Sequence, residues 1–232
     1  MAQSIPYSVI RKIRANPVDL EALFLGHCGL LTEAHDPIPY SKNLRERYRY
    51  LCQKFQLSPP IGLAVQFGGL RPYNFPTIRL SQLAQLMHHY PALLEQLYQS
   101  KQLRGLDLFR AVGVSEFWKT HFSFSTTTPS KQVARDKKLS ESFRALVLIN
   151  TVIPVLYAYA KWQGQDRSEW LFQQLEALAS EKNSLVDFYE ALGFPLQNAL
   201  DSQALLQLEY AYCRPRQCLK CAVGFSILKE TS

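Results

Sequence analysis

Residues 20–31, LEALFLGHCGLL, carry the pattern that decides the fold class of this chain of 232 residues. Apolar side chains recur there every three or four residues, which is the spacing of one face of an α-helix. They stand at Leu20, Leu23, Phe24, Cys28 and Leu31, and the spacing returns at Leu80, Leu83, Ala84 and Met87 and at Leu171, Leu175 and Leu178. Strand-like alternation is scarce. The sequence therefore predicts an all-α, multi-helix fold.

Two stretches interrupt the helical pattern. Residues 58–75 contain three glycines and Pro72, and they predict a long irregular loop. Residues 123–138, SFSTTTPSKQVARDKK, are rich in Ser, Thr and Lys and offer little to bury, so they predict a surface loop or linker. We expect a single helical domain over residues 1–232, which this loop can divide into 1–122 and 139–232.

Residues 145–160, ALVLINTVIPVLYAYA, run for 16 residues without a charge. A membrane span needs about 20 apolar residues, and Asn150 and Pro154 interrupt this segment. It therefore predicts a helix buried on all sides inside the protein, kinked near Asn150 by Pro154, and no membrane association. Because the N-terminal residues lack the apolar stretch of a secretory signal, we expect a cytoplasmic protein.

Prolines and a polar residue mark two further helices. Pro76 suits the first turn of a helix that can extend to about Ser100, with a break at Pro91. In the last amphipathic segment, Asp201 or Ser202 is a natural N-cap.

The net charge of +7 is unevenly distributed. Residues 1–161 hold 20 Lys and Arg and 10 Asp and Glu, residues 162–209 hold two and eight, and residues 210–232 hold four and one. Such polarity can attract an anionic partner such as nucleic acid, and it can equally reflect attraction between two halves of one chain or to a partner subunit. We expect a protein partner or a homo-oligomer.

Residues 41–54, SKNLRERYRYLCQK, combine Arg45 and Arg49 on one helix face with nearby tyrosines. Cations beside aromatic rings suit single-stranded nucleic acid, and a solvated charged face is the alternative. Arg71 and Arg79 flank Asn74-Phe75-Pro76 and can bind an anion at a helix N-terminus or tie down the long loop.

Trp118 and His121 lie three residues apart in FWKTHFSF and so share a helix face. The histidine is a candidate ligand or proton carrier, and a hydrogen bond to a loop is the alternative.

Cys213, Cys218 and Cys221 form a C-x4-C-x2-C cluster, the pattern of a metal site. A structural zinc needs a fourth ligand, for which the candidates are Cys28, Cys52, His27, His35 and His121. An iron–sulfur cluster is the rival cofactor, although the fourth cysteine of the plant-type ferredoxin pattern is missing downstream. A metal-free cluster of buried thiols is the third alternative.

No phosphate-binding glycine loop, dinucleotide fingerprint or nucleophile elbow is present, which lowers the expectation of an enzyme without excluding one.

Several phrases together resemble a bacterial family known as domain of unknown function 2851. These are LEALFLGHCGLL, RPYNFPTIRLSQLA, FWKTHFSF, LINTVIPVLYAYA and DSQALLQLEYAYCRPRQCLKCAVG. The resemblance is to the helical C-terminal half of that family, whose members are about twice as long and have a β-rich, nuclease-like N-terminal half. It implies a helical domain that works with a separately encoded partner, or a shortened relative that kept the helical scaffold.

We therefore expect a helical binding or scaffolding module, a partner subunit in a nucleic-acid-related complex, with a structural metal at the cysteines. The alternative is a metalloenzyme or redox sensor that uses the same cysteine cluster.

Overall fold

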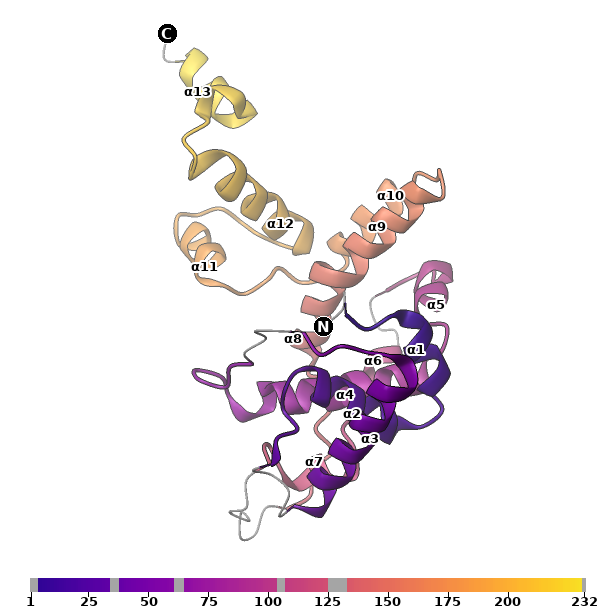
Figure 1. Ribbon diagram of the computed structural model, residues 1–232. Helices are drawn as coiled ribbons and strands as arrows, with labels where there is room; N and C mark the ends of the chain where they lie inside the picture. Colours follow the sequence, from indigo (N-terminus) through magenta and orange to yellow (C-terminus); the bar gives the residue numbers. More distant parts are fainter. Residues whose placement is uncertain (1–3, 34–37, 61–64, 104–106, 125–132, 231–232) are drawn as a thin grey trace. The chain divides into compact units, whose positions relative to one another are not determined.

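The computed structural model describes residues 4–33, 38–60, 65–103, 107–124 and 133–230 (Figure 1). Helices account for the regular structure of these residues, and no strand occurs among them, so the predicted all-α fold is confirmed. The chain divides into two compact units. The first comprises Met1–Gln96 and Asp107–Ser140, and the second comprises Leu97–Leu106 and Glu141–Ser232. Whether the loop 123–138 separates two domains stays a prediction.

The first unit is built around helix α2. Its helices are α1 (Tyr7–Ile13), α2 (Pro17–His27), α3 (Pro39–Phe55), α4 (Pro76–His89), α6 (Asp107–Arg110) and α7 (Glu116–Thr120), with the start of α5 (Leu93–Gln99). Pro17 occupies the first turn of α2, where its missing N–H costs nothing, and the Asn16 side chain accepts a hydrogen bond from Val18 N–H over 3.0 Å. Helices α3 and α4 both pack against α2.

Helix α2 is buried around its whole circumference because its apolar residues serve two clusters. Leu20, Leu23 and Phe24 face the cluster shared with α1, α3 and α4. Ala22 and Leu25 face the opposite way, toward the cluster that contains Trp118. Each buried Leu or Phe contributes about 1.5–3 kcal/mol, so the segment that carries the helical pattern also supplies the centre of the core.

Proline ends helix α4 as predicted. The helix begins at Pro76 and ends at His89, and after Pro91 the chain resumes as α5. The predicted irregular loop at 58–75 has no regular structure where it is described, apart from the 3-10 helix Pro72–Asn74, and residues 61–64 lie outside the described part.

The stretch 123–138 contains more buried side chains than its composition predicts. Phe124 joins the core cluster around Trp118, and Lys137 is only 2% exposed. Residues 125–132 of this predicted linker lie outside the described part. Residues 133–136 and 138 are exposed, as a surface loop predicts, whereas Phe124 and Lys137 depart from the prediction because they find partners in helices distant in sequence.

The second unit contains helices α8 (Glu141–Val147), α9 (Ile153–Trp162), α10 (Ser168–Glu176), α11 (Ser184–Ala191), α12 (Ala199–Leu208) and α13 (Ala222–Glu230). A π-helical turn, Leu148–Val152, joins α8 to α9 directly before Pro154. The proline lacks the N–H that would bond the carbonyl of Asn150, so the wider turn lies at the predicted position of the kink.

The prediction that residues 145–160 are buried on all sides is wrong. Leu148, Ile149 and Leu156 are buried, whereas Val155 and Tyr157 are exposed. Within the described ranges, Glu141–Trp162 is the one helix that is long and apolar enough to cross a membrane by length and composition, and 33% of its apolar window is buried. The expected absence of a membrane stays a prediction.

The N-cap of α12 differs from the predicted one. Asn198 caps the helix by accepting a hydrogen bond from Asp201 N–H over 3.0 Å. Asp201 instead accepts from Gln197 N–H over 2.9 Å, and Ser202 is fully buried. The helix therefore begins one turn earlier than the sequence indicated, because two polar residues in one turn both bond the backbone at its start.

Candidate functional site

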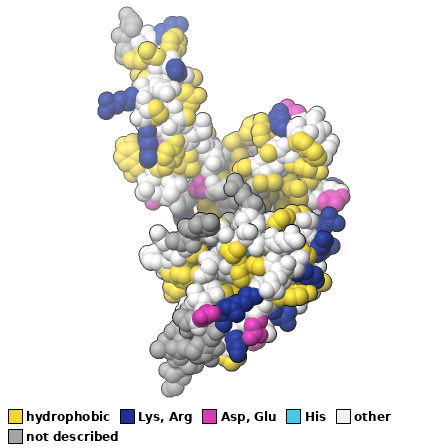
Figure 2. Space-filling model, in the orientation of Figure 1, with side chains coloured by type: hydrophobic (Ala, Val, Ile, Leu, Met, Phe, Trp, Pro, Cys, Tyr) yellow, Lys and Arg dark blue, Asp and Glu magenta, His cyan; other side chains and the backbone are white. Residues whose placement is uncertain are grey.

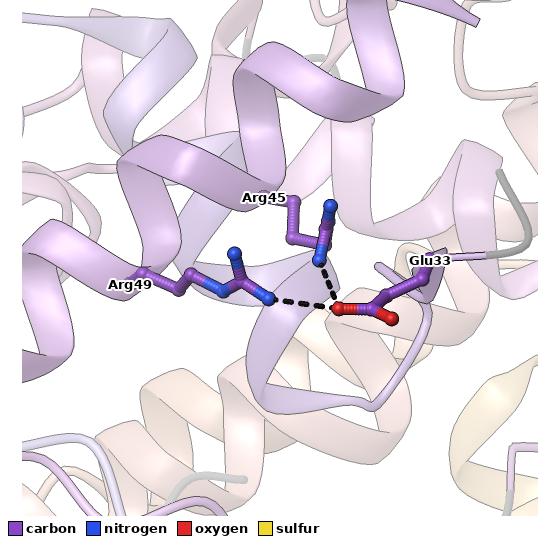
Figure 3. A network of polar contacts seen from close by, with 3 residues as sticks. All are labelled: Glu33, Arg45 and Arg49. Carbon is purple, nitrogen blue, oxygen red and sulfur yellow. Dashed lines mark hydrogen bonds and ion pairs between the residues drawn. The ribbon is translucent and has the colours of Figure 1, made fainter. Parts of the chain in front are cut away.

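Arg45 and Arg49, predicted to form a basic stripe on α3, are joined through one carboxylate (Figure 3). Arg45 Nη1 lies 2.9 Å from Glu33 Oε1, and Arg49 Nη2 lies 3.1 Å from the same oxygen atom. The Arg45 side chain is 10% exposed and that of Glu33 is 79% exposed. Both cations are therefore partly neutralised within the unit, and Arg49 is the one that solvent reaches.

A second basic and aromatic surface, which we define as Lys12, Tyr50, Lys54 and Phe55, lies where α1 meets the end of α3. Lys12 Nζ lies 5.8 Å and Lys54 Nζ 5.5 Å from the centroid of the Phe55 ring. Lys54 Nζ also lies 5.4 Å from the centroid of Tyr50, whose side chain is 57% exposed. Cation–π attraction favours ammonium groups beside such rings. Phe55 is half-buried against the core, so Tyr50 is the ring of this surface that a base can approach.

Sequence reasoning missed half of this surface. The segment 41–54 includes Tyr50 and Lys54, but Lys12 comes from α1, and Phe55 follows the segment directly. A signal for Lys12 was present in the run Arg11-Lys12-Ile13-Arg14, whose basic side chains flank a buried isoleucine. Tyr48, the other tyrosine of the predicted stripe, packs against Gly26 of α2.

The whole net charge of the chain belongs to the first unit. That unit holds 16 Lys and Arg and nine Asp and Glu, a net charge of +7, whereas the second holds 10 of each and is neutral. Figure 2 shows Lys and Arg side chains over the helices of the first unit and also on the segment that carries α13. The second unit is neutral as a whole, although its residues 210–232 hold four Lys and Arg and one Glu.

Arg79 is committed to the loop that precedes its helix. Its guanidinium donates to Asn74 Oδ1 over 2.7 Å and to Gln82 Oε1 over 2.9 Å. Burial lowers the pKa of Arg79. These contacts favour the predicted alternative of a side chain that ties down the loop. Arg71, four residues before Phe75, is exposed.

Trp118 and His121 do not lie together at a surface. Trp118 is fully buried in the core. His121 Nδ1 lies 2.9 Å from Thr120 Oγ1 and 3.0 Å from the carbonyl oxygen of Phe117, and its ring stacks on the Phe117 ring with centroids 4.1 Å apart. This geometry favours the alternative of a histidine that bonds neighbouring backbone.

Lys137 is a buried cation that caps the end of α7. Its ammonium donates to the backbone carbonyl oxygens of Trp118 and of His121, the latter over 2.7 Å, and lies 3.8 Å from the centroid of the Phe122 ring. Gln82 Nε2 donates to the Lys137 carbonyl oxygen over 2.7 Å. Burial lowers the pKa of Lys137 to about 8. No sequence pattern indicated this residue.

Glu21 is a fully buried carboxylate surrounded by hydroxyl groups. The Tyr40 hydroxyl donates to Glu21 Oε2 over 2.5 Å, and Ser115 Oγ donates to Oε1 over 3.2 Å. Burial raises the pKa of Glu21, while these hydrogen bonds act in the opposite direction. Burial and the neighbouring carboxylate raise the pKa of Tyr40. These contacts join α2, α3 and the start of α7. Glu21 is fully buried, whereas Tyr40 and Ser115 are half-buried.

Cys28 and Cys52, two candidates for a distant metal ligand, lie near Tyr48. The Tyr48 hydroxyl lies 3.1 Å from His27 Nδ1 and hydrogen-bonds Cys52. Burial raises the pKa of both thiols and lowers that of His27, so the cluster is uncharged at neutral pH. His35 lies outside the described residues.

The C-terminal cysteines surround the 3-10 helix Cys218–Lys220. Cys213 and Cys218 are exposed, and Cys221 is buried. Desolvation raises the pKa of Cys213, and Glu209 and the other two thiols raise it further. In the described ranges, no three side chains among His, Cys, Asp and Glu are arranged to hold a metal ion. Zinc, an iron–sulfur cluster and a metal-free cluster all stay predictions.

Comparison with models of known protein families gives a match over most of the chain. The family described as "Protein of unknown function (DUF2851)" matches residues 1–184. This protein belongs to that family. No curated protein and no solved structure matches the chain.

The DUF2851 match covers the first unit, and it covers the second unit up to the start of α11. It therefore includes the basic surface of α1 and α3, the Glu21 network and Lys137. The cysteine cluster lies beyond the matched residues, so the family membership does not bear on it. Whether the match corresponds to the C-terminal half of longer DUF2851 members stays a prediction.

Proposed function

We propose that this DUF2851 protein is a non-catalytic binding module whose first unit binds single-stranded nucleic acid. The observation that carries the proposal is the surface of Lys12, Tyr50, Lys54 and Phe55 on a unit that holds the entire net charge of +7. Phosphates attract ammonium groups whatever the base sequence, and an exposed ring such as Tyr50 offers a stacking face to any base. The pairing of Arg45 with Glu33 directs the proposal to this surface rather than to the middle of α3.

The salt dependence of the affinity for nucleic acid tests this proposal. Fluorescence anisotropy with labelled single-stranded DNA and RNA, over about 50 to 300 mM salt, measures the affinity and its slope. We expect the double variant Lys12→Glu/Lys54→Glu to bind at least about tenfold more weakly and to reduce the salt slope.

The matched control is Lys161→Glu/Lys182→Glu, which changes the net charge by the same amount at exposed positions of the second unit. A loss of affinity that is equal in the two double variants, or wild-type binding that does not respond to salt, would contradict the proposal. Circular dichroism spectra of all variants establish that the helices are intact.

A further inference from the structure

The second unit has an apolar groove of about 220 Å³. Its walls come from the π-helical turn, α9, α10 and the side chain of Gln203 in α12, and they include Ile153, Tyr157, Phe172 and Leu175. Tyr157 and Phe172 are among the exposed large apolar side chains of the unit. Such a groove is a typical docking site for an apolar helix.

Helix α13 presents side chains that fit such a groove. Val223 and Phe225 are exposed, the latter at 56%, and so is Leu219 in the preceding 3-10 helix. The helix packs closely on that 3-10 helix, because a Cβ atom at Gly224 would lie 2.7 Å from the carbonyl oxygen of Cys218. The apolar side chains of α13 thus project from a helix that packs against the 3-10 helix Cys218–Lys220.

Charge favours the binding of α13 in the apolar groove. Residues 162–209, which include α10 and Gln203, hold eight acidic and two basic residues, whereas residues 210–232 hold four basic and one acidic. Glu169 and Glu176 are exposed on α10, and Arg216 and Lys220 are exposed before α13. Basic side chains precede the apolar helix α13, and exposed acidic side chains lie on α10, which lines the groove, so the two carry complementary charge.

We propose that α13 of one copy of this protein docks into the groove of a second copy. Reciprocal docking buries both sets of apolar side chains in a closed, two-fold symmetric dimer. Anionic lipid is a poorer occupant because the segment that carries α10 has a net charge of −6 and is repelled by it. The inference does not depend on nucleic-acid binding, which concerns the first unit.

Sedimentation velocity on the full chain over a range of concentrations tests the proposal. We expect a concentration-dependent dimer, and we expect Phe225→Glu in the helix and Phe172→Glu in the groove each to weaken dimerisation about tenfold or more. Phe188→Glu is the matched control, because Phe188 on α11 is equally exposed, at 57%, and does not line the groove.

Mixing the two variants separates docking from unfolding. Each variant alone lacks every productive contact, whereas a mixed dimer pairs the intact helix of Phe172→Glu with the intact groove of Phe225→Glu. We expect the mixture to regain part of the dimer population. Failure to regain it, or a wild-type chain that remains a monomer at every concentration, would overturn the proposal, as would a monomer that binds anionic vesicles through Phe172.

Discussion

The ammonium group of Lys137 lies 2.7 Å from the backbone carbonyl oxygen of His121, inside the first unit. The contact joins the end of the 123–138 stretch to the end of α7, and the buried cation has partners only in backbone carbonyls and the Phe122 ring among the contacts described. An unpaired buried cation is costly, and this cost makes the stability of the fold sensitive to pH.

Stability should rise with pH between about 8 and 10.5 through Lys137. Its pKa is about 8 in the folded protein and ordinarily 10.5, so the unfolded chain binds the proton more tightly in this window, and unfolding becomes harder as pH rises. We expect the wild type to gain on the order of 1–3 kcal/mol relative to Lys137→Met across the window. Urea unfolding of both proteins measures the difference. Parallel pH profiles would show that the pKa is unchanged by folding.

Removing the hydroxyl of Tyr40 should destabilise the fold. Tyr40→Phe leaves the buried Glu21 carboxylate without its shortest hydrogen bond, at a cost of about 1–3 kcal/mol at neutral pH. Because burial raises the pKa of Glu21, its carboxyl group binds a proton more readily in the folded protein than in the unfolded chain. The loss of stability caused by Tyr40→Phe should therefore shrink as pH falls and the carboxyl group becomes neutral. Urea unfolding at neutral and acidic pH measures it, with Tyr7→Phe, an exposed tyrosine, as control.

A methyl group at Gly26 should disrupt the contact between α2 and α3. A Cβ atom there would lie 2.2 Å from the Tyr48 ring, far inside van der Waals contact. We expect Gly26→Ala to cost at least about 1–3 kcal/mol. The double variant Gly26→Ala/Tyr48→Leu should recover part of the loss, because the ring is gone. Thermal unfolding of the wild type, Gly26→Ala, Tyr48→Leu and the double variant gives the coupling free energy between the two positions. Strictly additive losses of stability would argue against the clash.

Tyr50→Ala should weaken binding of single-stranded nucleic acid more than binding of a duplex. An exposed ring that stacks on a base contributes about 1–3 kcal/mol, and paired bases are not available for stacking. The comparison is anisotropy with matched single- and double-stranded probes, and Tyr210→Ala in the second unit is a control of similar exposure. An equal effect on both probes would assign Tyr50 a structural role.

Cys213 and Cys218 should react with a thiol reagent before the other cysteines. Both are exposed, whereas Cys28 and Cys221 are buried. Since the pKa of Cys213 is raised, its reaction should accelerate as pH rises. Mass spectrometry after partial labelling identifies the order. Elemental analysis of the same protein decides the metal question, because stoichiometric zinc or iron would protect these two thiols and reverse the expected order.

The helical architecture was predictable because it rests on local spacing. The pattern of Leu20, Leu23 and Phe24 marks a helix whatever surrounds it, and Pro76 and Pro91 limit α4 through the geometry of their own rings. The same local logic failed at residues 145–160, because periodicity cannot tell whether an apolar face is covered. It also failed at Phe124, where a polar neighbourhood concealed a core residue.

By itself, the sequence determined the all-α class, the helix breaks at prolines and the uneven distribution of charge. Only the tertiary structure decided which cations remain available to a partner. Arg45 is paired with Glu33, and Lys137 is enclosed by α4 and α7, whereas the exposed Lys12 and Lys54 meet beside the half-buried ring of Phe55. The physical reason is that helix periodicity arises from neighbours three and four residues away, whereas pairing and burial depend on side chains that the fold brings together from distant parts of the chain.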